Sequence, residues 1–378
     1  MKFETKAIWV GQAADQATGA TIVPIYQTST FTQEEVNKNK GYEYSRVGNP
    51  TRTALDACLA SLEEGKYGLS FSSGLAAEHA IFSLLRPGDH VIVPDDMYGG
   101  TYRLIKQILE PFEIKFTFTD FTNPELIREA FLPSTKMVWI ETPTNPLLKI
   151  FDIGVISELS HKKNALVVVD NTFSTPYFQK PLLLGADIVV HSTTKYINGH
   201  SDIIGGAIVL NDTDSYQKIL LVQKSIGAVP SPFDSWLTLR GVKTLAVRMR
   251  QHEENAFKVA GFLEQQVNVE EVFFPGLETH PGYTIAKKQM TGFGGIVSMR
   301  IKGGLAECNT FFKKLKVFQL ADSLGGVESL ANYSALMTHE AFPPELRQKI
   351  GVTDNLIRLS VGIEHIDDLI EDLEIALH

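Results

Sequence analysis

The sequence predicts an α/β protein: a mainly parallel β-sheet followed by a smaller α+β domain. Between about residues 50 and 240, short apolar runs alternate with helical patterns, as in a parallel sheet with crossover helices. After residue 240, a pattern that suits one long helix (240–266) precedes two more strand-like runs, 294–301 and 355–364, which flank helical patterns. These observations favour two packed units rather than one.

The strand-like runs of the first unit come in a regular order along the chain. They are HVIVP (90–94), KFTFTD (115–120), KMVWIETP (136–143), ALVVVDNTF (165–173), ADIVVHS (186–192) and GGAIVL (205–210). The last run begins too soon after its predecessor for a crossover helix, so we expect one antiparallel strand. Residues 1–49 lack such periodicity and predict an extended arm. The predicted division is therefore an arm (1–49), an α/β domain (50–240) and a C-terminal α+β domain (241–378).

Composition narrows the possible functions. The formal net charge is −9, and no block of like charges offers a footprint for nucleic acid or an anionic membrane. The N-terminus lacks a basic stretch followed by an apolar segment, and no apolar run is long enough to span a bilayer. Cys58 and Cys308 stand far apart without metal-ligand spacing, so we expect reduced core cysteines and no metal site. We expect a cytoplasmic protein that acts on a small molecule.

Two strand ends carry residues that are costly to bury. Asp170 ends the run ALVVVD and needs a cation or hydrogen-bond donors, while Lys195 follows the run ADIVVHS. Ligands of open α/β sheets gather at the carboxyl ends of the strands, so both side chains can face one cavity. A structural ion pair is the alternative interpretation.

Two segments could bind an anion. Ser192, Thr193 and Thr194 bring hydroxyls to the Lys195 loop, and Gly74 and Leu75 open a helical pattern whose first N–H groups are free. An ordinary helix N-cap would also explain the second segment. A lysine, a buried aspartate and a phosphate site together match the needs of pyridoxal 5'-phosphate, so we predict this cofactor.

Eight motifs extend the argument to nearly the whole chain. In order they are YEYSRVGNPT, SSGLAA, DDMYGGT, ETPTNP, VDNTF, HSTTKYINGHSD, SLGGVESL and IRLSVGIE. Together they resemble the Cys/Met metabolism family of pyridoxal-phosphate enzymes, which includes cystathionine γ-synthase, cystathionine γ-lyase, cystathionine β-lyase and methionine γ-lyase. The resemblance implies a type I (aspartate aminotransferase-like) fold with a seven-stranded sheet. It also implies a catalytic homodimer, with two such dimers forming a tetramer.

The resemblance also implies roles for individual residues. Lys195 would bind the cofactor covalently and move protons, Asp170 would keep the ring nitrogen protonated, and Tyr98 would stack on the ring. The implied cofactor-binding residues are Tyr44, Arg46, Gly74, Leu75, Tyr98, Glu141, Asn145, Asp170, Thr172, Ser192, Thr194 and Lys195. Tyr44 and Arg46 would reach the phosphate site of the neighbouring subunit, although a solvated arm would show the same pattern.

The implied substrate contacts are Arg103, Glu328, Ser329 and Arg358. Arg358 would grip the substrate carboxylate, unless it is a surface arginine on a strand. Glu328 favours γ-chemistry on cystathionine, either elimination or replacement on an O-acylhomoserine, in cysteine biosynthesis and methionine metabolism. Gly100 stands where methionine γ-lyases usually have a cysteine, which disfavours methionine cleavage.

Three alternatives remain open. A cystathionine β-lyase would give homocysteine, pyruvate and ammonia. A pyridoxal-phosphate fold recruited as a regulator would not turn over, but the intact set of Tyr98, Asp170, Lys195 and Arg358 argues against it. A nucleotide-dependent α/β protein is disfavoured because neither a Walker lysine loop nor GxGxxG follows a first strand.

Overall fold

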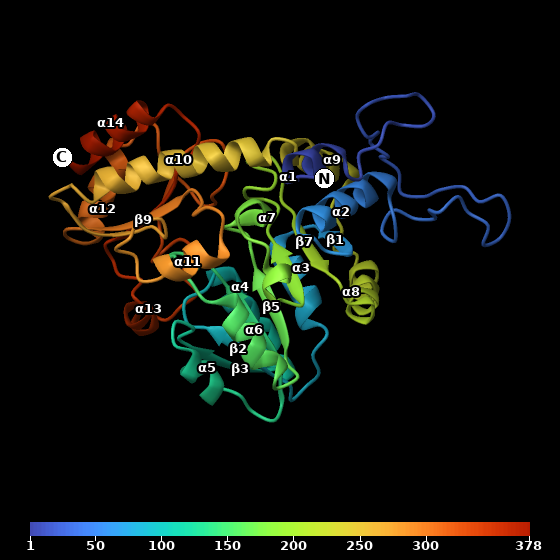
Figure 1. The fold of residues 1–378 in the computed structure, drawn as a ribbon, viewed down its shortest axis with the longest axis horizontal. Helices are drawn as coiled ribbons and strands as arrows, with labels where there is room; N and C mark the ends of the chain where they lie inside the picture. Colours follow the sequence, from blue (N-terminus) through green and yellow to red (C-terminus); the bar gives the residue numbers. More distant parts are fainter.

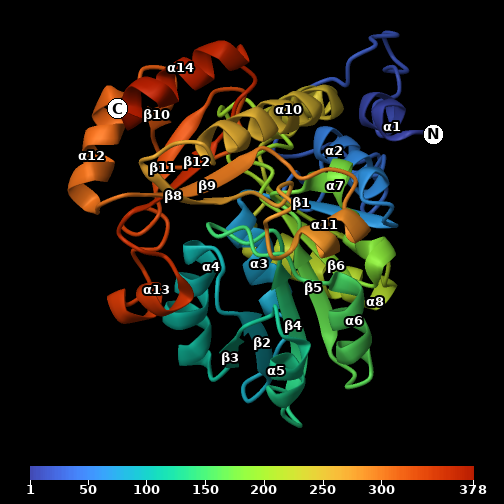
Figure 2. The same ribbon diagram turned by 60° about the vertical axis from the view of Figure 1, so that its left-hand side comes forward.

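The computed structural model describes residues 1–378 and contains two β-sheets flanked by helices (Figures 1 and 2). The larger sheet has seven strands in the order β1-β7-β6-β5-β4-β2-β3. Its strands are β1 (Tyr67–Phe71), β2 (His90–Pro94), β3 (Lys115–Thr119), β4 (Thr135–Glu141), β5 (Leu166–Asp170), β6 (Ile188–His191) and β7 (Gly206–Leu210). All neighbours are parallel except β7, which runs antiparallel to β1 and β6. This confirms the predicted mainly parallel sheet and its single antiparallel strand.

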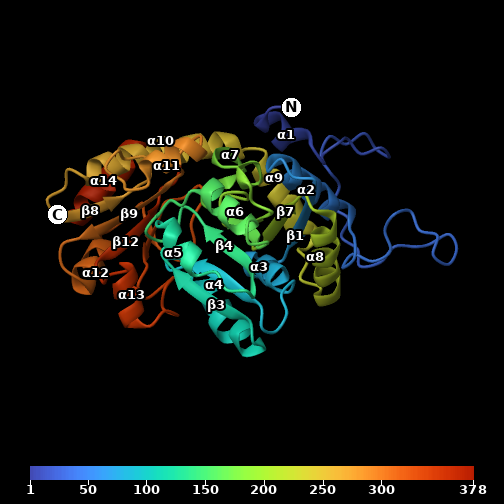
Figure 3. The ribbon, with the colours of Figure 1, turned by 60° about the horizontal axis from the view of Figure 1, so that its bottom comes forward.

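Helices surround both sheets (Figure 3). They are α1 (Phe3–Trp9), α2 (Pro50–Leu62), α3 (Gly74–Phe82), α4 (Gly99–Leu104), α5 (Pro124–Glu129), α6 (Ile153–His161), α7 (Thr175–Phe178), α8 (Thr213–Ile226), α9 (Pro232–Val242), α10 (Leu245–Leu263), α11 (Tyr283–Gln289), α12 (Leu305–Lys314), α13 (Pro344–Ile350) and α14 (Ile366–Leu377). A π-helical turn (Ile105–Leu109) and two 3₁₀ turns (Glu110–Phe112 and Pro181–Leu184) complete the set. No helix combines the length and apolar character needed to cross a bilayer.

The larger sheet is buried on both faces because alternate residues of its strands enter different cores. In β2, Val91 and Val93 join the core that contains α3 and α8, whereas Ile92 joins the core of α5 and α6. The first of these cores continues into the smaller sheet. The two sheets therefore share one continuous apolar interior.

The smaller sheet has five strands in the order β10-β11-β12-β9-β8. They are β8 (Val269–Phe273), β9 (Ile296–Ile301), β10 (Gln319–Leu320), β11 (Leu330–Tyr333) and β12 (Leu356–Ser360). Only the β10–β11 pair is parallel. Strands β9 and β12 are the two that the sequence predicted, and the helices α10, α12 and α14 lie beside this sheet (Figure 2).

The expected long helix at 240–266 is broken between α9 and α10. The Gly241 carbonyl, instead of continuing the helix, accepts hydrogen bonds from Thr244 N at 3.1 Å and from Arg248 Nη2 at 2.9 Å. Arg248 is buried and also donates through Nη1 to the Tyr196 carbonyl at 2.7 Å. Because the helix breaks here, Arg248 at the start of α10 can donate hydrogen bonds to the backbone of the loop that follows Lys195.

The N-terminal segment begins with α1, which packs against α2, and then runs without regular helix or strand to the start of α2. Isolated bridges, such as Thr30 to Tyr44, are its only β-pairing. Figure 1 shows these residues extending away from the body of the chain. Several of their apolar side chains are exposed, with Val36 at 93%. The helix α1 was not predicted, and the arm makes few contacts with its own chain.

Candidate active site

A cavity of about 470 Å³ opens at the carboxyl ends of the central parallel strands. Glu141 ends β4, Asp170 ends β5 and Ser192 follows β6, which is where open α/β sheets bind their ligands. Most of the predicted site residues line this cavity: Gly74, Leu75, Tyr98, Arg103, Glu141, Asn145, Asp170, Thr172, Ser192, Thr194, Lys195 and Arg358. The structure therefore brings together residues separated by up to 284 positions, Gly74 and Arg358 being the extremes.

Lys195 lies in the turn after β6, and its amine faces the cavity. Nζ donates a hydrogen bond to Ser323 Oγ at 2.7 Å. Burial, with the nearby Arg358 charge, lowers the pKa of Lys195 to about 8, although Asp322 opposes the shift. The lowered pKa makes the uncharged amine, which a nucleophile or proton acceptor requires, more accessible near neutral pH than that of an ordinary lysine.

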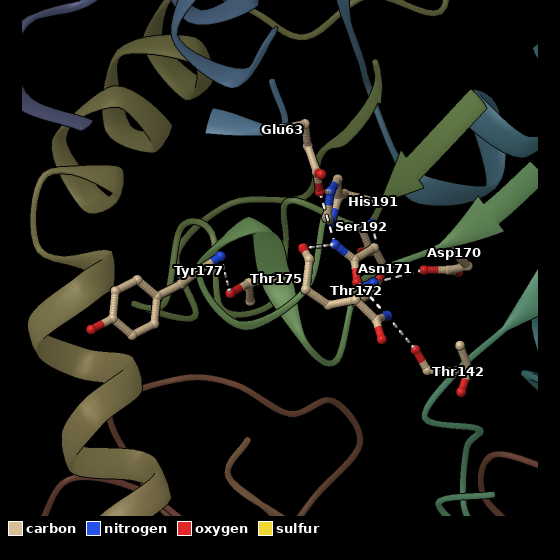
Figure 4. Close-up of polar contacts among 10 residues, drawn as sticks. Glu63, Thr142, Asp170, Asn171, Thr172, Thr175, Tyr177, His191 and Ser192 are labelled. Atoms are coloured by element: carbon tan, nitrogen blue, oxygen red, sulfur yellow. Dashed lines mark hydrogen bonds and ion pairs between the residues drawn. The ribbon is translucent and has the colours of Figure 1, made fainter. Parts of the chain in front are cut away.

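Asp170 ends β5, which pairs in parallel with β6, the strand that precedes Lys195, so both residues lie at the same edge of the sheet as expected. Its Oδ1 accepts a hydrogen bond from Thr172 N at 2.9 Å (Figure 4). Burial raises the pKa of Asp170, while Thr172 and the charge of His191 lower it. Asp170 lines the cavity and forms no ion pair, so its carboxylate can accept a hydrogen bond from a ligand N–H.

The N-terminus of α3 faces the segment after β6. Ser73 caps the helix by accepting from Ala76 N at 3.0 Å, so the predicted N-cap and the predicted anion site coincide. A Cβ on Gly74 would lie 3.0 Å from Ser192 Cβ, so glycine permits this close approach. Thr194 exchanges its hydrogen bonds with the backbone of Gly205. Free helix N–H groups beside Ser192 make this end of the cavity suited to a phosphate.

Tyr98 precedes α4 and covers one side of the cavity, with 37% of its surface exposed. Its backbone N–H donates to Glu141 Oε2 at 2.8 Å. A Cβ on Gly100 would lie 2.3 Å from Tyr98 Cε1. A side chain at position 100 would thus displace the Tyr98 ring from this orientation.

Arg358 is a buried residue of β12, 1% exposed, and not a surface arginine. Nη1 donates to Asn145 Oδ1 at 2.8 Å and Nη2 to the Ser323 carbonyl at 2.7 Å, while Nε has no partner. Burial lowers the pKa of Arg358 to about 10, which leaves it charged at neutral pH. A fixed, incompletely paired guanidinium facing a cavity is suited to a carboxylate.

Two pairs of predicted residues lie outside the cavity of their own chain. Arg46 donates through Nη1 to the Lys224 carbonyl at 2.7 Å and lies over the exposed Tyr44 ring. Ser329 is fully buried, and its Oγ donates to Glu364 Oε2 at 2.8 Å and accepts from Gly362 N at 2.8 Å.

Glu328, the residue on which the γ-assignment rested, accepts a hydrogen bond from Ser201 and does not line the cavity. The acidic residue and the serine that do line it are Asp322 and Ser323, six positions earlier. The segment ADSLGGVESL contains two acid–serine pairs, and the pair that lines the cavity is Asp322–Ser323, not the pair expected from the resemblance. Ser323 has a φ of +93°, unusual for a residue other than glycine, which places both its hydroxyl and its carbonyl at the cavity.

The cavity also contains an acid that the sequence analysis missed. Glu78, one turn along α3, is 3% exposed, and its Oε2 has no hydrogen-bond partner. Burial and the Asp170 charge raise the pKa of Glu78 well above its usual range. The sequence SSGLAAEHAIF could have indicated this acid. Glu78 lies one turn after the start of the predicted helix, and the start of that helix is where we expected the phosphate.

These residues fit pyridoxal phosphate. Lys195 supplies an amine of lowered pKa, Asp170 a buried acceptor for the ring N–H, and the α3 N-terminus with Ser192 an anion site. The fold and the cavity together define a pyridoxal-phosphate enzyme of the type I fold.

Comparison with known proteins identifies the family. The family model described as Cys/Met metabolism PLP-dependent enzyme matches residues 4–378, and the chain belongs to this family. The cystathionine γ-lyase of Dictyostelium discoideum is 51% identical over 377 residues, which cover 100% of this chain and 97% of that protein. The cystathionine β-lyase of Coxiella burnetii is 50% identical over 376 residues, 99% of this chain and 97% of that protein.

A solved structure supports the same assignment. The cystathionine γ-synthase of Xanthomonas oryzae pv. oryzae, in complex with aminoacrylate and cysteine, has a TM-score of 0.97 at 44% identity and covers 100% of this chain and 98% of that chain. Relatives with three different activities are thus similar to this chain to nearly the same degree.

Proposed function

We propose that this enzyme makes or breaks the C–S bond of cystathionine by chemistry at the γ-carbon, as a γ-lyase or as a γ-synthase acting on an O-acylhomoserine. The observation that carries the proposal is the arrangement of Lys195, Arg358 and the acid Asp322 around one cavity. Arg358 suits the α-carboxylate of an amino acid, and Asp322, exposed at the cavity, suits the cationic amine at the far end of cystathionine. This assigns to Asp322 the attraction that the sequence analysis gave to Glu328.

Bound pyridoxal phosphate supplies an electron sink for the charge left when a substrate proton departs. Lys195 is the only lysine on the cavity, so we assign to its amine the proton transfers at the α-, β- and γ-carbons of the substrate. The Ser323 hydroxyl, 2.7 Å from Nζ, holds this amine when it is not bound to the cofactor. Burial raises the pKa of Tyr98, so its hydroxyl stays protonated and can donate to a departing sulfur.

We further propose a homodimer as the catalytic unit, with two dimers forming a tetramer. Arg46 and Tyr44 lie outside their own cavity, at an arm whose apolar side chains are exposed in the single chain. A neighbouring chain that covers this arm would bury those side chains and receive Arg46 at its phosphate end. The same proposal includes substrate-binding roles for Arg103 and Arg358. It also includes cofactor-binding roles for the cavity residues named above. We place the enzyme in the cytoplasm, where it would serve cysteine and methionine metabolism.

Product analysis tests the reaction. Incubation with L-cystathionine should give cysteine, 2-oxobutyrate and ammonia, and a second incubation with O-succinyl- or O-acetylhomoserine plus cysteine should test for cystathionine formation. Homocysteine and pyruvate as the main products of the first incubation would overturn the γ-assignment in favour of a β-lyase. Absence of any turnover by cofactor-loaded enzyme would favour a regulatory protein.

Matched variants test the position of the acid. Asp322→Asn should raise KM for cystathionine, because it removes the negative charge at the cavity, while Glu328→Gln should change KM little. The reverse result would return the substrate contact to Glu328.

A further inference from the structure

The loop that follows β11 reaches across to the segment that carries Tyr98. This loop, residues 334–343, belongs to the C-terminal domain and places Met337 and Thr338 on the cavity. Tyr98 lies between β2 and α4 of the larger domain. The contacts between the two segments centre on His339, which is fully buried and does not itself line the cavity.

His339 joins the loop to the backbone immediately before Tyr98. Its Nε2 lies 3.1 Å from the Met97 carbonyl oxygen, and its Nδ1 lies 2.9 Å from Thr338 Oγ1. A carbonyl oxygen can only accept, so Nε2 carries the proton and donates to Met97. Burial lowers the pKa of His339 to about 3, so the ring is neutral and Nδ1 accepts from the Thr338 hydroxyl. Both ring nitrogens are therefore paired, and the imidazole has one defined orientation.

A stack of three aromatic rings holds the same histidine. The His339 ring lies over Phe342 with 5.1 Å between the ring centroids, and Phe342 stacks on Tyr102 of α4 at 3.8 Å. All three side chains are buried. Rings packed in this way between the two domains leave the imidazole little freedom to move away from Met97.

The loop also contacts the residue after Tyr98. The Thr338 carbonyl lies so close to Gly99 that a Cβ at position 99 would collide with it. Glycine thus permits the loop backbone to pack directly on the first residue of α4. The loop therefore holds the backbone on both sides of Tyr98.

We propose that His339 is a positioning residue: its hydrogen bond to the Met97 carbonyl holds Tyr98 where the ring can stack on bound pyridoxal phosphate. This inference rests on the proposed role of Tyr98. His339 does not line the cavity, so it acts through the Met97 backbone and not by contact with the cofactor.

Two substitutions at position 339 separate the hydrogen bond from the packing. His339→Phe keeps an aromatic ring for the stack on Phe342 but removes the donor to Met97. His339→Gln places an amide N–H near the position of Nε2 and can keep this donor. The readouts are the dissociation constant of added pyridoxal phosphate and the circular dichroism of the bound cofactor, which responds to the ring that stacks on it.

We expect His339→Phe to weaken cofactor binding about tenfold, the equivalent of about 1.4 kcal/mol, because the Met97 carbonyl is left unpaired in the core and the Tyr98 segment shifts. The circular dichroism of the bound cofactor should change as well. His339→Gln should bind the cofactor as tightly as the wild type. Unchanged affinity in His339→Phe, or an equal loss in both variants, would overturn the proposal.

His90 supplies the matched control. It is a buried histidine whose two nitrogens lie 2.8 Å from Thr135 Oγ1 and 2.8 Å from Thr117 Oγ1. It opens β2, at the end of this strand away from the cavity. His90→Phe should lower the unfolding temperature of the cofactor-free protein, as His339→Phe does, but leave cofactor affinity unchanged. An equal loss of affinity in both phenylalanine variants would reduce the effect at position 339 to general destabilisation and overturn the proposal.

A double variant tests whether His339 acts through Tyr98. Tyr98→Leu alone should weaken cofactor binding; if it does not, the proposed role of Tyr98 fails. Tyr98→Leu/His339→Phe should bind the cofactor as weakly as Tyr98→Leu and no more weakly. Additive losses would place the effect of His339 elsewhere and overturn this inference alone.

A shorter side chain keeps the outcome decisive if His339→Phe does not fold. His339→Asn retains an oxygen that can accept from Thr338, but its amide is too short to reach the Met97 carbonyl. It should show the same tenfold loss of cofactor affinity, the equivalent of about 1.4 kcal/mol. Wild-type affinity in His339→Asn would contradict the proposal.

Discussion

Replacing the reactive lysine with methionine should stabilise the cofactor-free protein. The pKa of Lys195 is lowered to about 8 from 10.5, because burial and Arg358 disfavour the charged amine. At pH 7 this shift corresponds to about 3 kcal/mol of lost stability. Methionine has a similar length and no charge, but it loses the hydrogen bond to Ser323, about 1 kcal/mol. Lys195→Met should therefore raise the free energy of unfolding by about 2 kcal/mol at pH 7.

The stability gained by Lys195→Met should depend on pH. Below pH 8 the folded state must hold a charged amine at a cost, and above about pH 10.5 the amine is neutral in both states. Wild-type stability from this group therefore rises between these values, and the advantage of Lys195→Met should shrink over the same window. Urea unfolding of cofactor-free protein at pH 7 and at pH 10 measures it, with the exposed Lys313→Met as control. A Lys195→Met protein that is less stable than wild type at pH 7 would refute the reasoning.

Three more predictions follow from the cavity and the arm. Mixing an inactive Arg46→Ala chain with an inactive Lys195→Ala chain should restore part of the activity, because one site of each hybrid dimer contains both residues. If hybrid dimers are shown to form and have no activity, the two subunits do not share a site. Gly100→Ala should weaken cofactor binding in an equilibrium titration, since the new Cβ would lie 2.3 Å from Tyr98 Cε1, and unchanged affinity would contradict this role for glycine. Glu78→Gln should raise the unfolding temperature at pH 8, because the raised pKa of Glu78 means that ionising its carboxyl at high pH destabilises the folded state. The gain should vanish near pH 4, where the carboxyl is protonated in both states. A difference that stays constant with pH would oppose this assignment.

The α/β sheet could be predicted because its strands are buried on both faces and therefore read as apolar runs. The run ALVVVDNTF (165–173) contains β5 (Leu166–Asp170), and the run ADIVVHS (186–192) contains β6 (Ile188–His191). Strand β1 was missed because YGLSF contains glycine and serine and is not a continuous apolar run. It forms because β7 pairs with it along its full length, a tertiary effect that a local pattern does not contain.

The site residues at strand ends could be predicted for a related reason: Asp170 and Lys195 are polar where the pattern demands apolar residues. The choice between Asp322–Ser323 and Glu328–Ser329 could not be made locally, since both pairs sit in the same short segment. In the structure Ser329 donates a hydrogen bond to Glu364, and Ser323 lines the cavity. The buried contact between Glu63 Oε1 and His191 Nε2 was also beyond the sequence, because the two residues lie 128 positions apart.

Covalent labelling tests the central claim most directly. Borohydride reduction of the cofactor-loaded enzyme should fix pyridoxal phosphate to one lysine, and peptide mapping should find the label on Lys195, whose amine faces the cavity 2.7 Å from Ser323 Oγ. A single label on the peptide that contains Lys195, absent from Lys195→Ala, is the predicted result. A label on any other lysine, such as Lys149 or Lys224, would contradict the assignment of this cavity as the active site.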